Sequence, residues 1–348
     1  MALSDDFADA TVRHQVYLQR YKSGVVKNIL KLLKNVEDDI ISETVKRDLE
    51  AMSRRDLDKL FVRLRQIIKD GYKPIIAALD DEIKKLSAYE AKWQGNLFAN
   101  VVPIDIDFVT PAYEQIYAAA VARPFQGRLL REWYQGLEDG QFIRVRAAIR
   151  EGFVQGQTTQ QIVQAIRGTR SQRGIIEQSR RGAEAAVRTA LAHTANVARS
   201  EVYKKNRKVI KAVEWVSTLD GRTTAICRAL DGKVYEVDKG PRPPAHVGCR
   251  STTIPVVKSL RELGIKVDEN KVASTRASMN GQVSSELNYD QWLRKQSQSF
   301  QDEVLGKSKA KLFRAGLTMD RFIDRKGNEL TLDQLMALES AAWTKAGL

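Results

Sequence analysis

Three residues of the types that bind metal ions lie close together in the second half of the sequence: Cys227, His246 and Cys249. Thiolate and imidazole groups are the ligands that zinc prefers, and the short His-x-x-Cys spacing lets two ligands reach one ion. Asp220, on an Asp-Gly turn before Cys227, is the candidate fourth ligand of a closed structural site. A water molecule in its place would give the open site of a zinc enzyme, and the sequence does not choose between the two.

Two other interpretations of this cluster stay open. Both cysteines can be small buried hydrophobic residues, with His246 bonded to a backbone carbonyl. A disulfide between the cysteines is the less favoured alternative, because a reducing compartment keeps thiols free. His14 and His193 lie in helical patterns, and the sequence has neither a Ser-His-Asp signature nor a phosphate-binding glycine loop. We therefore expect no enzyme, with hydrolysis at a zinc-bound water as the minority hypothesis.

The second candidate site is a basic segment upstream of the cluster. Residues 150–211 hold thirteen Lys and Arg against four acidic residues, which accounts for nine of the net charge of +14. Such side chains neutralise phosphates without reading bases, so we predict nonspecific contact with double-stranded DNA. A solvated helix end that attracts cations through the helix dipole is the simpler alternative for the lysines. The predicted DNA-binding residues are Arg167, Arg170, Arg173, Arg180, Arg181, Lys204, Lys205, Arg207, Lys208 and Lys211.

Helices must position most of these residues, because apolar side chains recur every three or four positions over much of the chain. In the first hundred residues this spacing predicts a helical hairpin or bundle. Gly71 and Pro74 predict a stop and a restart there, since glycine suits a helix end and proline the next first turn. The alternating Ile104, Ile106 and Phe108 predict an extended connector over 98–111.

Further helices follow over residues 113–208, including one that a capping box at Thr158 and Gln161 begins and an alanine-rich one over 183–208. Strands are predicted at 213–217, 233–237 and 251–256, with Pro255 restricting the last to a sheet edge or a strand end. We predict a loop over 274–285 and a helical tail over 289–348. The fold class is mainly α with a small α+β module, a long helical N-terminal region preceding a compact C-terminal domain.

The predicted parts are a partner-binding helical region (1–100), a helical region with the basic segment (111–211), the α+β module (212–260), and a loop with a helical tail (261–348). The length of 348 residues is enough for about two domains. No apolar stretch approaches the roughly 18 residues of a membrane span, and the acidic first residues lead into no signal core. We therefore expect no membrane span. We also expect the protein to stay in the cytoplasm where it is made.

The order of these parts forms a pattern: an Asp-x-Arg-Thr turn, then a cysteine, then Pro-Pro-x-His-x-x-Cys-Arg. Over about residues 140–340 the chain resembles the phage Mu F-like family, the minor head or head-morphogenesis proteins of tailed phages. Members often have Arg-Thr-Glu where this chain has Arg188, Thr189 and Ala190. The motif residues are Asp220, Arg222, Thr223, Cys227, Pro243, Pro244, His246, Cys249 and Arg250.

This resemblance implies a low-copy component of the phage head interior, present in the host cytoplasm during assembly. The partners it implies are the portal protein, other head or scaffold proteins, and double-stranded DNA. The expected role is in procapsid assembly and in genome packaging or delivery. The alternative is a zinc-dependent nuclease or an injected toxin or effector, because some relatives carry toxin domains after the F-like module.

Overall fold

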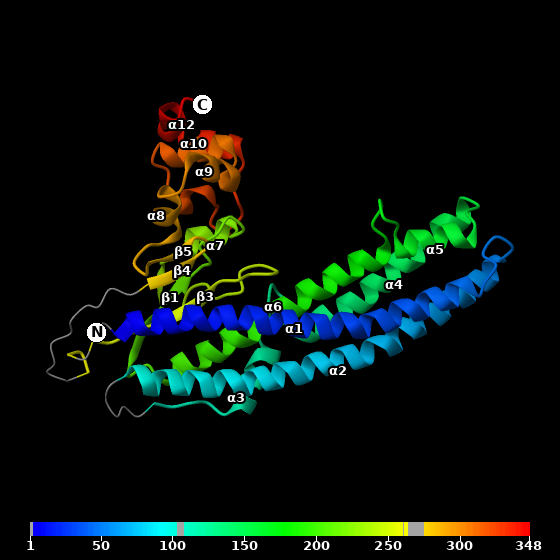
Figure 1. Cartoon of the computed structure of the whole chain (residues 1–348), viewed down its shortest axis with the longest axis horizontal. Helices are drawn as coiled ribbons and strands as arrows, with labels where there is room; N and C mark the ends of the chain where they lie inside the picture. The colour runs from blue at the N-terminus through cyan, green and yellow to red at the C-terminus, as the bar shows by residue number, and fades with distance from the viewer. Residues whose placement is uncertain (1–2, 103–107, 260, 264–274) are drawn as a thin grey trace. The chain divides into compact units, whose positions relative to one another are not determined.

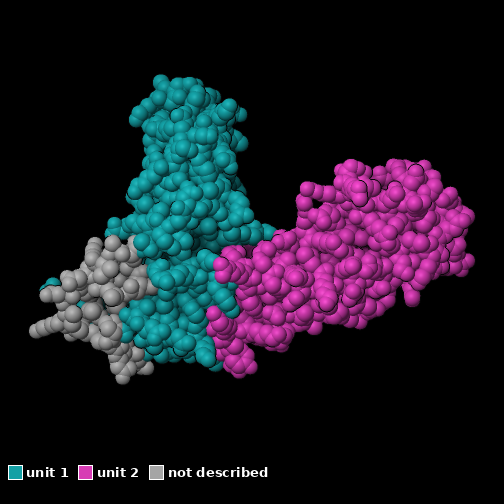
Figure 2. Space-filling model, viewed as in Figure 1, with its two compact units in different colours: residues 1–18, 90–112, 196–348 teal, residues 19–89, 113–195 magenta. Residues whose placement is uncertain are grey.

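The computed structural model describes residues 3–102, 108–259, 261–263 and 275–348. The chain is mainly helical, with a small sheet in its C-terminal part, which confirms the predicted fold class (Figure 1). Contacts group it into unit 1 (residues 1–18, 90–112 and 196–348) and unit 2 (residues 19–89 and 113–195) (Figure 2). These units combine distant stretches of sequence, so the four-part division stays a prediction. No helix among the described residues is both long and apolar enough to cross a membrane.

Unit 2 consists of helices, and three of them also contribute residues to unit 1. The helices are α1 (Leu3–Val45), α2 (Arg54–Val101), α3 (Tyr113–Ala122), α4 (Leu130–Val154), α5 (Thr159–Arg167) and α6 (Ile175–Lys205). The three that contribute to both units are α1, α2 and α6. The predicted capping box at the start of α5 is present, with the Thr158 hydroxyl accepting from the Gln161 backbone N–H and the Gln161 side chain returning to Thr158. Since α2 ends at Val101, the predicted connector is wrong for its first residues, and 103–107 lie outside the described residues.

The predicted break at Gly71 and Pro74 is wrong, because α2 continues through both residues. The apolar stripe of α2 stays buried on both sides of the proline, with Leu64 and Ile68 before it and Leu79 after it. The role of Gly71 is instead to let α2 pack closely on α1, because a Cβ added there would lie 2.5 Å from a methyl carbon of Val36 on α1. Burial of the stripe therefore outweighs the one hydrogen bond that the proline removes.

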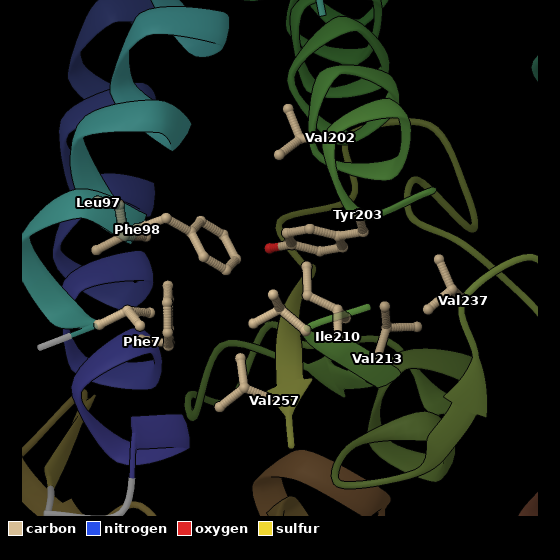
Figure 3. Packing of buried hydrophobic residues seen from close by; sticks show 11 residues of the cluster. Phe7, Leu97, Phe98, Val202, Tyr203, Ile210, Val213, Val237 and Val257 are labelled. Atoms are coloured by element: carbon tan, nitrogen blue, oxygen red, sulfur yellow. The ribbon is translucent and has the colours of Figure 1, made fainter. Parts of the chain in front are cut away.

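A three-stranded antiparallel sheet in unit 1 has the order β2-β1-β3. The strands are β1 (Ile210–Val216), β2 (Val234–Glu236) and β3 (Thr252–Val257). Pro255 pairs with Val213 on an edge strand, as predicted. The sheet packs against aromatic residues from both long N-terminal helices, with the Phe7 and Phe98 ring centroids 4.4 Å apart (Figure 3). The core of unit 1 therefore joins residues of the first 102 positions with residues 202–257.

The predicted loop over 274–285 is wrong, because β4 (Thr275–Ser278) and β5 (Gly281–Ser284) form an antiparallel hairpin; Ser274 lies outside the described residues. These strands lack the apolar alternation that predicts a strand, since the buried side chain of β4 is Arg276. The helical tail is confirmed. It consists of α8 (Tyr289–Arg294), α9 (Gln298–Leu305), α10 (Lys307–Arg314), a 3-10 turn (Met319–Phe322), α11 (Leu332–Leu338) and α12 (Ser340–Lys345).

Candidate metal centre and basic surfaces

The structure brings together three of the four predicted metal ligands. Cys227 lies on the short helix α7 (Ala225–Leu230), and His246 and Cys249 lie in the loop that precedes β3. The Cys227 Sγ is 3.7 Å from the Cys249 Sγ and 3.3 Å from the His246 Nε2. All three donor atoms fall within 4.8 Å of one another, and both cysteines are free and buried. Two thiols and an imidazole this close can hold a metal ion.

Backbone contacts set the tautomer of His246. Its Nδ1 lies 2.9 Å from the carbonyl oxygen of Val247, which only accepts, so Nδ1–H is the donor. In its neutral form the ring directs the Nε2 lone pair toward the sulfur atoms, where it also accepts from the Thr224 hydroxyl at 2.8 Å. Metal-binding histidines commonly donate their other ring N–H to a carbonyl in this way. His246 is thus oriented as a ligand.

The two thiols differ in acidity. A hydrogen bond with Cys227 lowers the pKa of Cys249 to about 4, against the effect of burial and with help from His246. The same pairing, together with burial, raises the pKa of Cys227. The hydrogen bond with Cys249 raises the pKa of His246. The cluster therefore favours a thiolate at Cys249, the form of cysteine that binds metals.

Asp220 is not part of this cluster. Its carboxylate forms a bidentate pair with Arg250, with Oδ2 2.5 Å from Nη1 and Oδ1 2.7 Å from Nη2. The Arg222 backbone N–H donates to the same Oδ1 at 3.0 Å. Arg250 directly follows Cys249 in the sequence. The ion pair of Asp220 with Arg250 therefore fixes the loop that carries His246 and Cys249, without contact between Asp220 and the three candidate ligand atoms. The sequence could not distinguish these two roles, because both need an acidic residue at this turn.

Comparison with protein families identifies the segment that contains this cluster. Residues 144–254 match the family described as phage Mu protein F like protein. This segment is similar to that family. Comparisons of the chain with curated proteins and with solved structures find no match. The match begins within α4 and ends within β3, so it includes the metal-ligand cluster and every predicted DNA-binding residue. The F-like match supports a phage head-related role and a location in the virion.

The ion pair of Asp220 in the F-like domain predicts a pH dependence. Burial of Asp220 opposes its ionisation, but the hydrogen bonds and charge of Arg250 outweigh burial and lower the Asp220 pKa. A lowered folded-state pKa adds stability above the unfolded value of about 3.9, and this stability is lost as pH falls through the folded value. In urea unfolding between pH 6 and pH 3, we expect a shallower loss of stability in Asp220→Asn than in wild type. Identical slopes would contradict the pairing.

Sequence reasoning missed a buried ion pair between Asp231, which lies within the F-like segment, and Arg276, which lies outside it. Asp231 accepts hydrogen bonds from the backbone N–H groups of Ser217 at 2.5 Å and Tyr289 at 2.7 Å. It also pairs with both terminal nitrogens of Arg276, at 3.0 and 3.1 Å, and both side chains are buried. The Ser217 hydroxyl donates to the carbonyl oxygen of Cys227 at 2.8 Å. Asp231 thus links β1, the metal-ligand helix, the β4-β5 hairpin and α8.

The ten predicted DNA-binding residues divide into two kinds. Five have a carboxylate partner: Arg180 with Glu37, Arg181 with Glu177, Lys204 with Glu201, Arg207 with Asp238, and Lys211 with Glu262. The other five are exposed and form no ion pair with any described residue: Arg167, Arg170, Arg173, Lys205 and Lys208. The three arginines lie in unit 2 and the two lysines in unit 1. The positive charge available to a partner is therefore smaller and more local than the sequence indicates.

Proposed function

We propose that this protein is a minor structural component of a tailed-phage head that associates with the portal in the virion interior. The observation that carries the proposal is the phage Mu protein F-like match, which includes the Cys227, His246 and Cys249 cluster. In this role the protein aids procapsid assembly and genome packaging or delivery. It acts as a structural protein, so the cluster holds the fold together and carries out no reaction.

The metal of this proposal is a structural zinc ion held by Cys227, His246 and Cys249. With Zn–S bonds of about 2.3 Å and a Zn–N bond of about 2.05 Å, tetrahedral angles place two sulfurs about 3.8 Å apart and a sulfur and nitrogen about 3.6 Å apart. The observed distances of 3.7 and 3.3 Å fit these values. When bound, zinc supplies a cross-link between α7 and the loop before β3.

Portal association is assigned to the long helices of the first hundred residues. In unit 2, α1 and α2 leave apolar side chains in solvent, with Val45 57% and Val62 73% exposed. Singly exposed apolar side chains are common on protein surfaces, so these two valines serve as the test positions of the proposal. Other head or scaffold proteins are further partners of the same kind.

We expect portal subunits of the same phage to co-purify with the full-length protein when the two are co-expressed. Replacing Val45 and Val62 by Asp should weaken this association at least about tenfold, because a buried charge costs more than 1.4 kcal/mol. Replacement of Val154, which is 82% exposed on α4, by Asp is the matched control and should leave capture unchanged. Failure of the wild-type protein to retain any virion component would contradict the proposal.

A zinc-dependent nuclease or injected effector is the second candidate function. The observation that favours it is the partial exposure of His246, which leaves the cluster accessible to solvent on one side. A water in the fourth position of such a site is the attacking group of zinc hydrolases. Metal-dependent cleavage of plasmid DNA that His246→Ala abolishes, in a variant with unchanged circular dichroism, would establish the nuclease and reject the structural role.

A further inference from the structure

The last residue of α5, Arg167, and the connection from α5 to α6, residues 168–174, together form what we name the arginine loop. It contains Arg167, Arg170 and Arg173 and no acidic residue. All three arginines are exposed, and within the described part of the chain none has a carboxylate partner. The loop extends from the helices of unit 2 (Figure 1). By contrast, Arg180 and Arg181, farther along α6, are each paired with a glutamate. The charge of the loop is thus free to meet a ligand.

Two glycines hold the ends of the arginine loop together. Gly168 and Arg173 form an antiparallel bridge, and the φ of Gly168 is +86°, which glycine adopts without strain. A Cβ added at Gly174 would lie 2.2 Å from the Gly168 nitrogen and 2.6 Å from the Ile166 carbonyl oxygen. Only glycine permits so close a crossing of the backbone. The ends of the loop are therefore fixed on the two helices.

Hydrogen bonds order the tip of the loop as well. The Thr169 N–H donates to the Gln172 carbonyl at 2.7 Å, and the Gln172 N–H donates to the Thr169 hydroxyl at 3.0 Å. These bonds fix the backbone on either side of Arg170. A loop ordered before binding loses little conformational entropy when its side chains contact a ligand. The arginines are thus presented on a preorganised support.

We propose that the arginine loop is a binding site for the phosphates of double-stranded DNA. Guanidinium groups match phosphate oxygens in charge and geometry, and three on one short loop suit successive phosphates of a backbone. The loop has no aromatic residue on which an unpaired base would stack, which favours a duplex over a single strand. The inference rests on the proposed role in genome packaging or delivery, and it assigns the DNA contact predicted from the sequence to a place in unit 2.

The test measures binding of the full-length protein to a 25-base-pair duplex by fluorescence anisotropy between 50 and 200 mM salt. Replacing Arg167, Arg170 and Arg173 together by Gln should lower affinity at least about tenfold and reduce the salt slope by about two to three. The matched control removes the same charge from exposed helical sites of unit 2, with Gln at Arg20, Arg55 and Arg131. The control should change the slope by less than about one. Equal effects of the two triple variants would overturn the proposal.

A second variant tests the shape of the loop without changing its charge. Gly174→Ala keeps all three arginines but forces the crossing backbones apart, so we expect DNA affinity to fall at least about threefold with thermal stability still measurable by circular dichroism. An unchanged affinity would overturn the role of the preorganised loop. Heparin and polyglutamate serve as competitors at the same total charge as the duplex. Equal competition by either one would identify a general contact with anions and would also overturn the proposal of a DNA-binding loop.

The outcomes separate this inference from the proposed function. If the wild-type protein binds duplex DNA and the arginine-loop variant binds equally well, the loop assignment fails, while DNA contact through Lys205 and Lys208 survives. If the wild-type protein does not bind duplex DNA, the loop assignment fails, while portal association keeps its own independent test.

Discussion

The Asp231→Ala variant is expected to lose about 3–5 kcal/mol of unfolding free energy, which is the cost of removing one partner from a buried ion pair. The loss leaves the guanidinium of Arg276 buried and uncompensated beside the carbonyl oxygen of Ser217. It also removes the acceptor of two buried backbone N–H groups, those of Ser217 and Tyr289. Urea unfolding monitored by tryptophan fluorescence measures this loss, since Trp215 and Trp292 are buried in unit 1.

A double variant distinguishes an unpaired charge from lost packing. Asp231→Leu with Arg276→Met removes both charges, and apolar residues of similar volume often replace a buried pair at little cost. We expect the double variant to be more stable than Asp231→Ala. A loss below about 1 kcal/mol in Asp231→Ala, typical of an ordinary surface change, would contradict the buried network.

Removal of the metal has the second large expected effect. A ligand that binds only the folded state adds about 4 kcal/mol at a free concentration a thousand times its Kd. For a unit of this size we therefore expect a strong chelator to lower the Tm by about 10 °C, since α7 and the ligand loop lose their cross-link. Differential scanning calorimetry of the zinc-loaded and chelated protein measures the shift.

Two variants control the chelation experiment. Cys249→Ser should lower the Tm by itself and abolish any further effect of the chelator, because a ligand is already missing. His193→Gln, which changes a buried histidine that contacts the Ala120 carbonyl in unit 2, should leave the chelator effect intact. A Tm of wild type that does not respond to chelation would contradict a metal bound at this cluster.

The spacing of residue types along the sequence predicted those parts of the fold that depend on contacts between residues a few positions apart. The stripes of α2, the capping box of α5 and the edge position of Pro255 were predictable, because each reflects contacts set by a helical or strand period. The continuity of α2 through Pro74 was not, since it depends on burial against another helix through Gly71. Tertiary packing here outweighs the local signal for a helix end.

The proximity of Cys227, His246 and Cys249 was predictable because cysteine and histidine are rare in this chain and serve few roles. Asp220 could not be assigned from its spacing, since its partner Arg250 is 30 residues away. The Asp231 and Arg276 pair gave no signal, because 45 residues separate them and Arg276 lies in a polar strand without apolar alternation. Charge counting likewise overstated the basic segment, since carboxylates neutralise half of its predicted contacts.

Elemental analysis tests most directly whether Cys227, His246 and Cys249 hold a structural zinc ion. Protein purified without chelator should contain one equivalent of zinc per chain, and the Cys249→Ser variant prepared in parallel should contain almost none. Less than about half an equivalent in the wild-type protein, or the same amount in both proteins, would contradict the proposed zinc site.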